Sequence, residues 1–245
     1  FEKSEISPFF WKKISKSYAF ESMKFNYILD TQKAVWRTIA LRRIKCDVFI
    51  SASAAGLFSS KKIPRQNKKG NYYLEDLISL LDLIKPGTFE HDFKFPLPNK
   101  LLNQLDNLFE KNKSYIGYAP GAGEKRKVWK IEKLIEVAKY FENKNYKSVF
   151  FLGPEDILLK SKIKQSFPKA LYPEEIIEKF SGPEIVMAST KYLSCALANA
   201  SGVGAMLSTK YCPLVTLFGH HDASKFTPLS PNITTISSQD YGSKN

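Results

Sequence analysis

The loop after residue 119 carries the residues best suited to binding an anion. It contains Gly121 and Gly123, which can leave backbone N–H groups exposed, and basic residues at positions 125–127. Backbone amides and cationic side chains can together hold a phosphate or diphosphate. The GxxxxGK(S/T) spacing of a P-loop is missing. The loop is therefore predicted to be a phosphate-binding loop of another kind, or else a solvated basic turn.

A second glycine-containing stretch covers residues 197–231. Its turn at residues 199–204 leads into a short helical run at 205–208, and the apolar run 214–218, closed by Gly219, is typical of a buried strand. Free N–H groups at a helix start suit an anion, and glycine lets backbone approach a ligand closely. An ordinary turn, helix and strand of an α/β sheet is the competing interpretation, because short glycine patterns have many false positives.

Neither a metal site nor a catalytic triad stands out. His91 is isolated, and the adjacent His220, His221 and Asp222 do not supply the spaced ligands of a typical metal site. No serine lies in a GxSxG motif. We therefore predict a site without a metal ion, where Lys or Arg and helix N-termini stabilise a departing diphosphate.

The composition is that of a basic globular protein. Of its 245 residues 43% are hydrophobic, which allows a proper core and excludes a disordered chain. A net charge of +13 favours nucleic acid, an anionic membrane face or phosphorylated substrates, unless most lysines are merely solvated. The cysteines at positions 46, 195 and 212 form no CxxC pair, which argues for a reducing cytosol. The first residues, neither an initiator methionine nor a signal peptide, predict a truncated chain.

Periodicity predicts a parallel sheet in the first part of the chain. Strands are expected at residues 25–30 and 48–50, and helices at 32–44 and 71–84. Strand–helix–strand–helix order is typical of parallel pairing. The first of these helices has a basic face that includes Arg37.

The second part is expected to alternate strands and helices again, after a Pro-rich link at residues 85–98. Such an open parallel sheet binds ligands at its strand ends. We predict an α/β fold with one lobe at residues 1–97, link included, and another at 98–245. The expected helices are residues 100–109, 131–141, 157–167 and 191–198, and the expected strands are residues 115–119, 148–152 and 185–187.

Three segments, in this order, resemble glycosyltransferase family 9, the ADP-heptose:lipopolysaccharide heptosyltransferase family. Residues 27–32 (YILDTQ) are similar to the family's hhhDxQ strand end, and residues 119–129 look like its PGAG…KxW loop. Residues 199–205, with 213–219 (PLVTLFG), are similar to NDSGxxH…PxVxLFG. The likeness spans most of the chain.

The resemblance implies a GT-B architecture of two Rossmann-like lobes with parallel sheets, the acceptor on the first and a nucleotide-sugar on the second. The first lobe is expected to be incomplete, because the family's opening strand and its Gly-Asp turn, which supplies the general base, have no counterpart; nor has the usual last helix. The implied reaction is an inverting, metal-independent, cofactor-free transfer of heptose or a similar sugar. The donor is expected to be ADP-linked, and the acceptor a lipopolysaccharide-core or related glycolipid.

Roles carry over position by position. Backbone at positions 121–123 would face the diphosphate, Lys127 would neutralise it as the one catalytic residue assigned, and Glu155 would contact the nucleoside. The general base is expected in an N-terminal segment that this sequence does not contain. The implied site residues are Gly121, Ala122, Gly123, Lys127, Glu155, Ala200, Ser201, Gly202, Val203 and Ala205 for the donor, and Asp30, Gln32 and Arg37 for the acceptor side.

Two positions depart from the family pattern: Ala200 stands where the family has Asp, and Ala205 where it has His. An unmade polar contact costs about 1–3 kcal/mol. The alternative is therefore a catalytically silent GT-B-fold protein that binds a nucleotide-sugar or an anionic glycolipid.

The expected partners are a nucleotide-sugar and a lipid-linked saccharide. The expected location is the bacterial cytoplasm, with peripheral contact to the anionic inner-membrane face. No nucleic acid is expected, because RRM, OB and helix-turn-helix signatures are missing.

Overall fold

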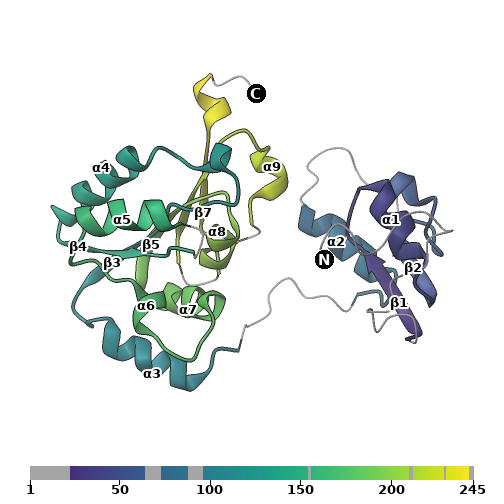
Figure 1. The fold of residues 1–245 in the computed structure, drawn as a ribbon, viewed down its shortest axis with the longest axis horizontal. Coiled ribbons are helices and arrows are strands. Elements are labelled where there is room, and N and C mark those ends of the chain that lie inside the picture. Colours follow the sequence, from purple (N-terminus) through teal and green to yellow (C-terminus); the bar gives the residue numbers. More distant parts are fainter. Residues whose placement is uncertain are drawn as a thin grey trace. The chain divides into compact units, whose positions relative to one another are not determined.

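The computed structural model describes residues 23–63, 73–87, 96–153, 156–209, 212–228 and 230–242. The chain divides into two compact units, residues 1–93 and 94–245 (Figure 1). This division lies near the predicted boundary after residue 97; which unit binds donor or acceptor stays a prediction. Within the described ranges, no helix combines the length and apolar character needed to cross a membrane.

The first unit is built on a two-stranded parallel sheet. Strand β1 (Phe25–Asp30) pairs with β2 (Cys46–Ser51), and helix α1 (Val35–Arg42) connects them. Helix α2 (Tyr73–Asp82) follows. Phe49 and Ile50 at the end of β2 are fully buried, so the strand ends are fixed by packing. The predicted parallel β-α-β order of this unit is confirmed.

The second unit contains a five-stranded sheet in the order β4-β3-β5-β6-β7, in which every neighbouring pair is parallel. Loops after the strands therefore collect at one edge of the sheet. The strands are β3 (Ser114–Ala119), β4 (Tyr146–Phe150), β5 (Leu193–Asn199), β6 (Leu214–Phe218) and β7 (Ile233–Ser237). The helices are α3 (Asn99–Leu108), α4 (Ile131–Glu142), α5 (Ile157–Ser166), α6 (Pro173–Ile176), α7 (Gly182–Ser189), α8 (Gly202–Leu207) and α9 (Ala223–Phe226).

Helices cover both faces of this sheet, with α4 and α5 on one side and α3, α6 and α7 on the other (Figure 1). Alternate residues of β3 divide between two cores. Tyr115 and Ala119 pack in the cluster that includes residues of α3 and α7, whereas Ile116 and Tyr118 pack with residues of α4 and α5. A strand buried on both faces has little alternation of polarity, which accounts for the continuous apolar runs of the sequence.

Two predicted elements around residue 190 are wrong. Residues 185–187 lie in helix α7, whose start is fixed by the Glu184 carboxylate: it accepts hydrogen bonds from the Ser181 N–H at 2.8 Å and hydroxyl at 2.6 Å. Residues 193–199 form the central strand β5, not a helix. Its small residues Ala196 and Ala198 are fully buried between the helix layers, so packing overrides their helix propensity.

Candidate functional site

The loop after β3 is held at both ends by one buried side chain, Asn199 at the end of β5. Its Nδ2 donates to the Pro120 carbonyl at 2.6 Å, and its Oδ1 accepts from the Trp129 N–H at 3.1 Å. Asn199 is 1% exposed, so these bonds are shielded from water. The sequence motif suggested a ligand-binding turn at this position; the structure shows that Asn199 positions the loop that carries Lys127.

The loop after β6 packs directly on the same loop. A Cβ atom added to Gly219 would lie 3.0 Å from the Arg126 carbonyl oxygen, and the Gly219 carbonyl accepts from the Ser238 hydroxyl at 2.7 Å. A side chain at position 219 would push the two backbones apart, since neither contact atom can rotate away. Glycine therefore favours the close approach of these loops.

A cavity of about 240 Å³ lies at this edge of the sheet, among the loops after β3, β5 and β6. Five of the predicted donor-binding residues line it: Lys127, Ala200, Ser201, Gly202 and Ala205. The structure therefore brings together residues that the sequence places about 75 positions apart. The remaining lining residues are Gly204, Thr216, Phe218, His221, Phe226 and Pro228.

Other predicted donor-binding residues lie away from this cavity. Gly121 is buried against the Asp156 carboxylate, where an added Cβ would lie only 2.2 Å from Oδ2. Ala122 and Gly123 are not among the cavity's lining residues, and the Val203 side chain packs against the hydrophobic core. Contact of these residues with a diphosphate stays a prediction. Glu155 lies outside the described residues.

Helix α8 begins beside the cavity with its first turn already capped. The Ser201 hydroxyl oxygen accepts from the Gly204 N–H at 3.2 Å. An added Cβ on Gly204 would lie 2.8 Å from the Asn199 carbonyl oxygen, which explains the glycine. Ser201 therefore has a structural role as an N-cap, in addition to lining the cavity.

The electrostatics of the cavity centre on Lys127, whose side chain is 22% exposed and whose Nζ lies 3.4 Å from Glu124 Oε1. Arg126 Nη2 lies 3.1 Å from Glu124 Oε2. Hydrogen bonds from Arg126 and Lys127 hold the pKa of the Glu124 carboxyl below its usual value. Partial burial and the neighbouring Lys127 charge lower the pKa of His221. An anion entering the cavity therefore competes with an ionised Glu124 for the Lys127 ammonium.

Thr216 is a site residue that the sequence motifs did not reveal. It is 2% exposed and lines the cavity, and its hydroxyl has no hydrogen-bond partner among the described residues. Buried hydroxyls are normally paired, so an unpaired one in a residue that lines a cavity marks a candidate ligand contact. The available signal was a lone polar residue in the apolar run 214–218.

We expect Thr216→Val to raise the free energy of unfolding by about 1 kcal/mol, because it removes a buried unsatisfied group without changing shape. The same change should weaken binding of a nucleoside diphosphate roughly three- to tenfold through one lost hydrogen bond. Urea unfolding and calorimetry measure the two effects. Thr235→Val is the control for both measurements. It also removes a threonine hydroxyl, but one that already has a partner, the Thr227 hydroxyl at 3.4 Å. Lower stability with unchanged binding would show that Thr216 has an internal partner instead.

Asp30, predicted on the acceptor side, is used within the first unit. Its carboxylate accepts from the Thr38 hydroxyl at 2.6 Å, the Ser51 hydroxyl at 2.9 Å and the Gln32 N–H at 3.0 Å. It is 1% exposed, and these bonds give it a structural role joining β1, α1 and β2, whereas its contact with an acceptor stays a prediction. Gln32 Oε1 accepts from Arg37 Nη1 at 3.2 Å, and the Arg37 side chain is exposed. Their contact with an acceptor stays a prediction.

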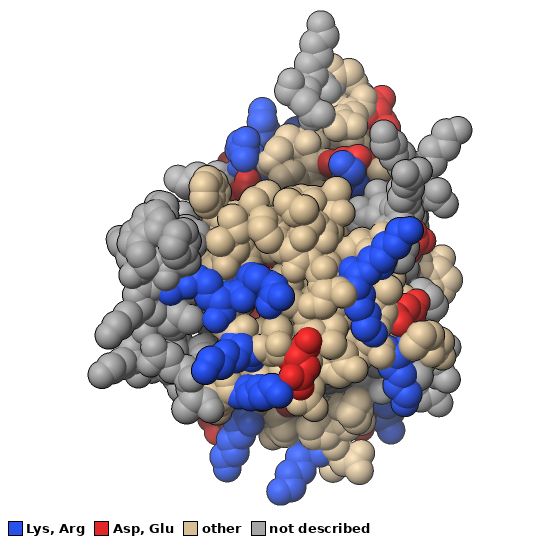
Figure 2. Space-filling view, turned by 90° about the vertical axis from the view of Figure 1, so that its right-hand side faces the viewer, with Lys and Arg blue, Asp and Glu red and all other residues tan. Residues whose placement is uncertain are grey.

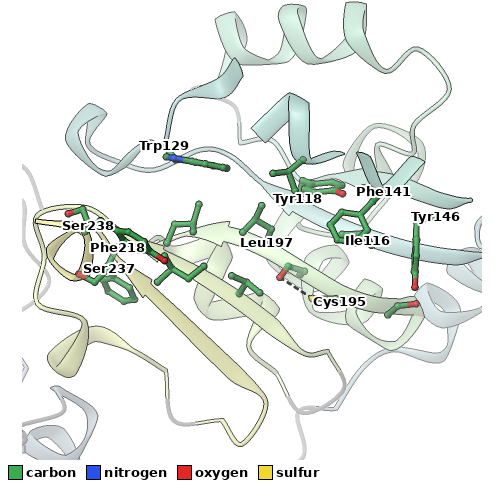
Figure 3. Close-up of a pocket in the computed structure, with 17 residues that line it drawn as sticks. Ile116, Tyr118, Trp129, Phe141, Tyr146, Cys195, Leu197, Phe218, Ser237 and Ser238 are labelled. Carbon is green, nitrogen blue, oxygen red and sulfur yellow. Dashed lines mark hydrogen bonds between the residues drawn. The ribbon is translucent and has the colours of Figure 1, made fainter. Parts of the chain in front are cut away.

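A larger cavity of about 790 Å³ lies on the sheet face that carries α4 (Figure 3). Its lining is mostly apolar and includes Tyr118, Trp129 and Leu197. None of its described lining residues is Lys or Arg, so it offers no cation for a diphosphate. It is not the donor site that the sequence motifs predict.

The paired histidines lie beside the smaller cavity and have an acidic neighbour. Glu124, from the loop after β3, approaches both His220 and His221. Asp222 is instead the N-cap of α9: its Oδ1 accepts a hydrogen bond from the Ser224 N–H at 3.0 Å. The prediction of no metal site considered only neighbours in the sequence; the fold adds a ligand from a distant loop.

Comparison with known proteins identifies what this fold is similar to. The model of glycosyltransferase family 9 (heptosyltransferase) matches residues 22–245. No curated protein sequence matches the chain. Among solved structures, a family 9 glycosyl transferase from Veillonella parvula DSM 2008 is 18% identical with a TM-score of 0.69, over 89% of this chain and 64% of that one.

Two Escherichia coli structures are also similar. Heptosyltransferase WaaC with ADP is 15% identical with a TM-score of 0.61, over 89% of this chain and 68% of that one. ADP-heptose LPS heptosyltransferase II is 16% identical with a TM-score of 0.62, over 86% of this chain and 67% of that one. At these identities the likeness establishes the fold, which is the α/β, parallel-sheet fold of those structures.

Proposed function

Because the chain belongs to glycosyltransferase family 9, we propose that it transfers a sugar from a nucleotide-diphosphate donor to an acceptor hydroxyl. The acceptor oxygen attacks the anomeric carbon from the side opposite the diphosphate, the bond from that carbon to the diphosphate oxygen breaks, and configuration inverts. A general base takes the hydroxyl proton; the described residues do not identify it. Lys127 stabilises the charge on the departing diphosphate, and no metal ion is needed for the step.

The observation that carries this proposal is the cavity at the sheet edge, which is lined by Lys127 and by Thr216, whose buried hydroxyl has no partner among the described residues. A cation suits the diphosphate, and a buried hydroxyl suits a sugar or phosphate oxygen. Complete small-molecule sites measure about 300–1,000 Å³. The cavity of about 240 Å³ is smaller, so we assign to it the diphosphate and the adjoining part of the sugar.

The donor and acceptor are proposed by analogy with the family. A solved relative is described with bound ADP, which supports an ADP-linked donor carrying heptose or a similar sugar. We propose a lipid-linked saccharide, of the lipopolysaccharide core or a related glycolipid, as acceptor at the first unit. Basic side chains outnumber acidic ones among the described residues of that unit, and they also predominate on the face of the molecule shown in Figure 2. This charge supports peripheral contact with the anionic inner face of a bacterial membrane.

The test is thermal unfolding of the purified chain with nucleoside diphosphates and their sugars, in the presence of EDTA. A ligand that binds only the folded chain raises the melting temperature. We expect ADP or an ADP-sugar to do so, and release of ADP to follow when a glycolipid acceptor is added. If no nucleoside diphosphate or its sugar shifts the melting temperature, the donor assignment fails.

A second candidate is a silent protein that binds the donor without transfer. It is favoured by Ala200 and Ala205, which both line the cavity where the resemblance leads us to expect Asp and His. Assaying the chain beside the Ala200→Asp/Ala205→His double variant separates the candidates. Transfer by the unmodified chain excludes the silent protein. A melting-temperature shift without transfer in either chain supports it.

A further inference from the structure

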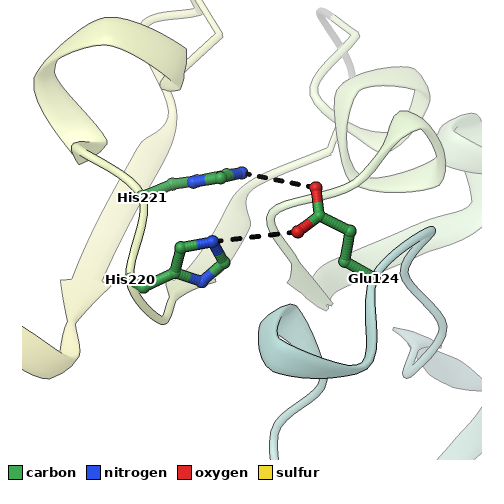
Figure 4. A group of neighbouring side chains, drawn as sticks. All are labelled: Glu124, His220 and His221. Carbon is green, nitrogen blue, oxygen red and sulfur yellow. Dashed lines mark ion pairs between the residues drawn. The ribbon is translucent and has the colours of Figure 1, made fainter. Parts of the chain in front are cut away.

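Glu124, His220 and His221 bring three potential metal ligands together (Figure 4). Glu124 Oε2 lies 3.8 Å from His220 Nε2, and Glu124 Oε1 lies 3.9 Å from His221 Nε2. The ligand atoms of all three residues lie within 4.8 Å of one another. In Figure 4 both rings turn an Nε2 atom toward the carboxylate.

These separations are too long for hydrogen bonds, which rarely exceed about 3.2 Å between nitrogen and oxygen. They are close to what a shared ion requires. With bonds of about 2.0–2.2 Å and tetrahedral angles, ligand atoms around Zn²⁺ lie roughly 3.3–3.5 Å apart. A bound ion would therefore draw these side chains closer together than they lie in the ion-free chain.

The state of His220 is a second, independent observation. Neither of its ring nitrogens has a hydrogen-bond partner among the described residues, although both atoms are buried. Shielded ring nitrogens without partners are unfavourable, since these polar atoms have lost water and gained nothing. Coordination through Nε2 would satisfy one of these atoms directly.

The loops that carry the cluster are held in place by other contacts. The approach of Gly219 to the Arg126 carbonyl sets the loop after β6 against the loop that bears Glu124. His221 is further packed against the Phe226 ring, with centroids 5.5 Å apart. A site assembled from two mutually packed loops is preorganised, as metal coordination requires.

We propose that Glu124, His220 and His221 form a binding site for a divalent transition-metal ion of the Zn²⁺ kind. Two imidazole nitrogens and one carboxylate suit Zn²⁺, Co²⁺ or Ni²⁺, whereas Mg²⁺ and Ca²⁺ prefer oxygen ligands. Three protein ligands leave a fourth position for water or a ligand oxygen. Arg126 and Lys127 also pair with Glu124. The ion competes with these cations, so we expect weaker binding than at closed structural zinc sites.

The test is calorimetric titration of the metal-free, untagged chain with Zn²⁺. We expect one ion per chain, at least tenfold weaker binding in His220→Ala and in His221→Ala, and no binding at this site in the double variant. Asp222→Asn is the matched control. It changes a neighbouring carboxylate outside the cluster and keeps an N-cap for α9, so its affinity should equal that of the unmodified chain.

Co²⁺ absorption distinguishes this site from thiolate binding. A cobalt site of nitrogen and oxygen ligands persists in the Cys46→Ser/Cys195→Ser variant, whereas a thiolate site is lost with it. Unchanged Zn²⁺ affinity in the folded His220→Ala/His221→Ala variant, or no binding by the folded chain, would overturn the proposal. Circular dichroism verifies folding. The nucleotide experiment is run in EDTA, so either proposal can fail without the other.

Discussion

Replacing Lys127 by alanine is expected to weaken binding of a nucleoside diphosphate at least tenfold. The Lys127 side chain is mostly shielded from solvent and the residue lines the cavity, so we expect its bond to a phosphate oxygen to be charge-assisted and poorly screened. Hydrogen bonds to charged groups contribute about 1.5–3 kcal/mol. A tenfold change corresponds to about 1.4 kcal/mol, so the estimate is conservative. Calorimetric titration with ADP in EDTA measures it.

Two further variants make the result specific to Lys127. Lys130→Ala removes an exposed lysine just after the loop and should leave the affinity unchanged, which excludes a general effect of net charge. Glu124→Gln removes the carboxylate that competes for the Lys127 ammonium, so it should strengthen binding. Equal affinity of Lys127→Ala and the unmodified chain would remove Lys127 from the donor site.

Asn199→Ala is expected to lower the free energy of unfolding of the second unit by about 2–5 kcal/mol. It leaves the buried Pro120 carbonyl and the partly buried Trp129 N–H without their partner, and each unsatisfied buried group costs about 1–3 kcal/mol. The loop that carries Lys127 also loses both of its anchors on β5. Urea unfolding followed by circular dichroism measures the change.

Asn103→Ala is the control for this substitution. Asn103 lies exposed in α3, where alanine is the better helix former, so the expected change is close to zero or slightly stabilising. Typical surface substitutions change the free energy of unfolding by no more than about 0.5 kcal/mol. If Asn199→Ala changes it by no more than this, the anchoring role is wrong.

Strong local patterns determined how much of the fold was predictable. The strands at 25–30 and 214–218 have the predicted bounds, because each is a short β-rich run closed by a clear stop, Asp30 or Gly219. The region around Ile185 and Ala196 was predicted wrongly. In this region, whether a segment forms a helix or a strand depends on whether it lies in a helix layer or in the central sheet. No short window of sequence contains that information.

The residues of the candidate site also differ in how far local sequence patterns could predict them. Lys127 and Ser201 belong to recognisable segments, and both line the cavity. Thr216 and His221 reach it only because β6 is placed beside β5. The fold likewise gives Asp30, a predicted ligand contact, a buried structural role, because two distant hydroxyls converge on it.

The backbone contact at Gly219 links the mobility of the two loops at the cavity. The Arg126 carbonyl approaches Gly219 so closely that a Cβ atom at this position would lie 3.0 Å from its oxygen. We therefore expect the loop after β3 and the loop after β6 to move together. Admission of a bulky sugar would then lift Lys127 and His221 together, so substitutions in either loop should alter the rates of entry and escape at the other.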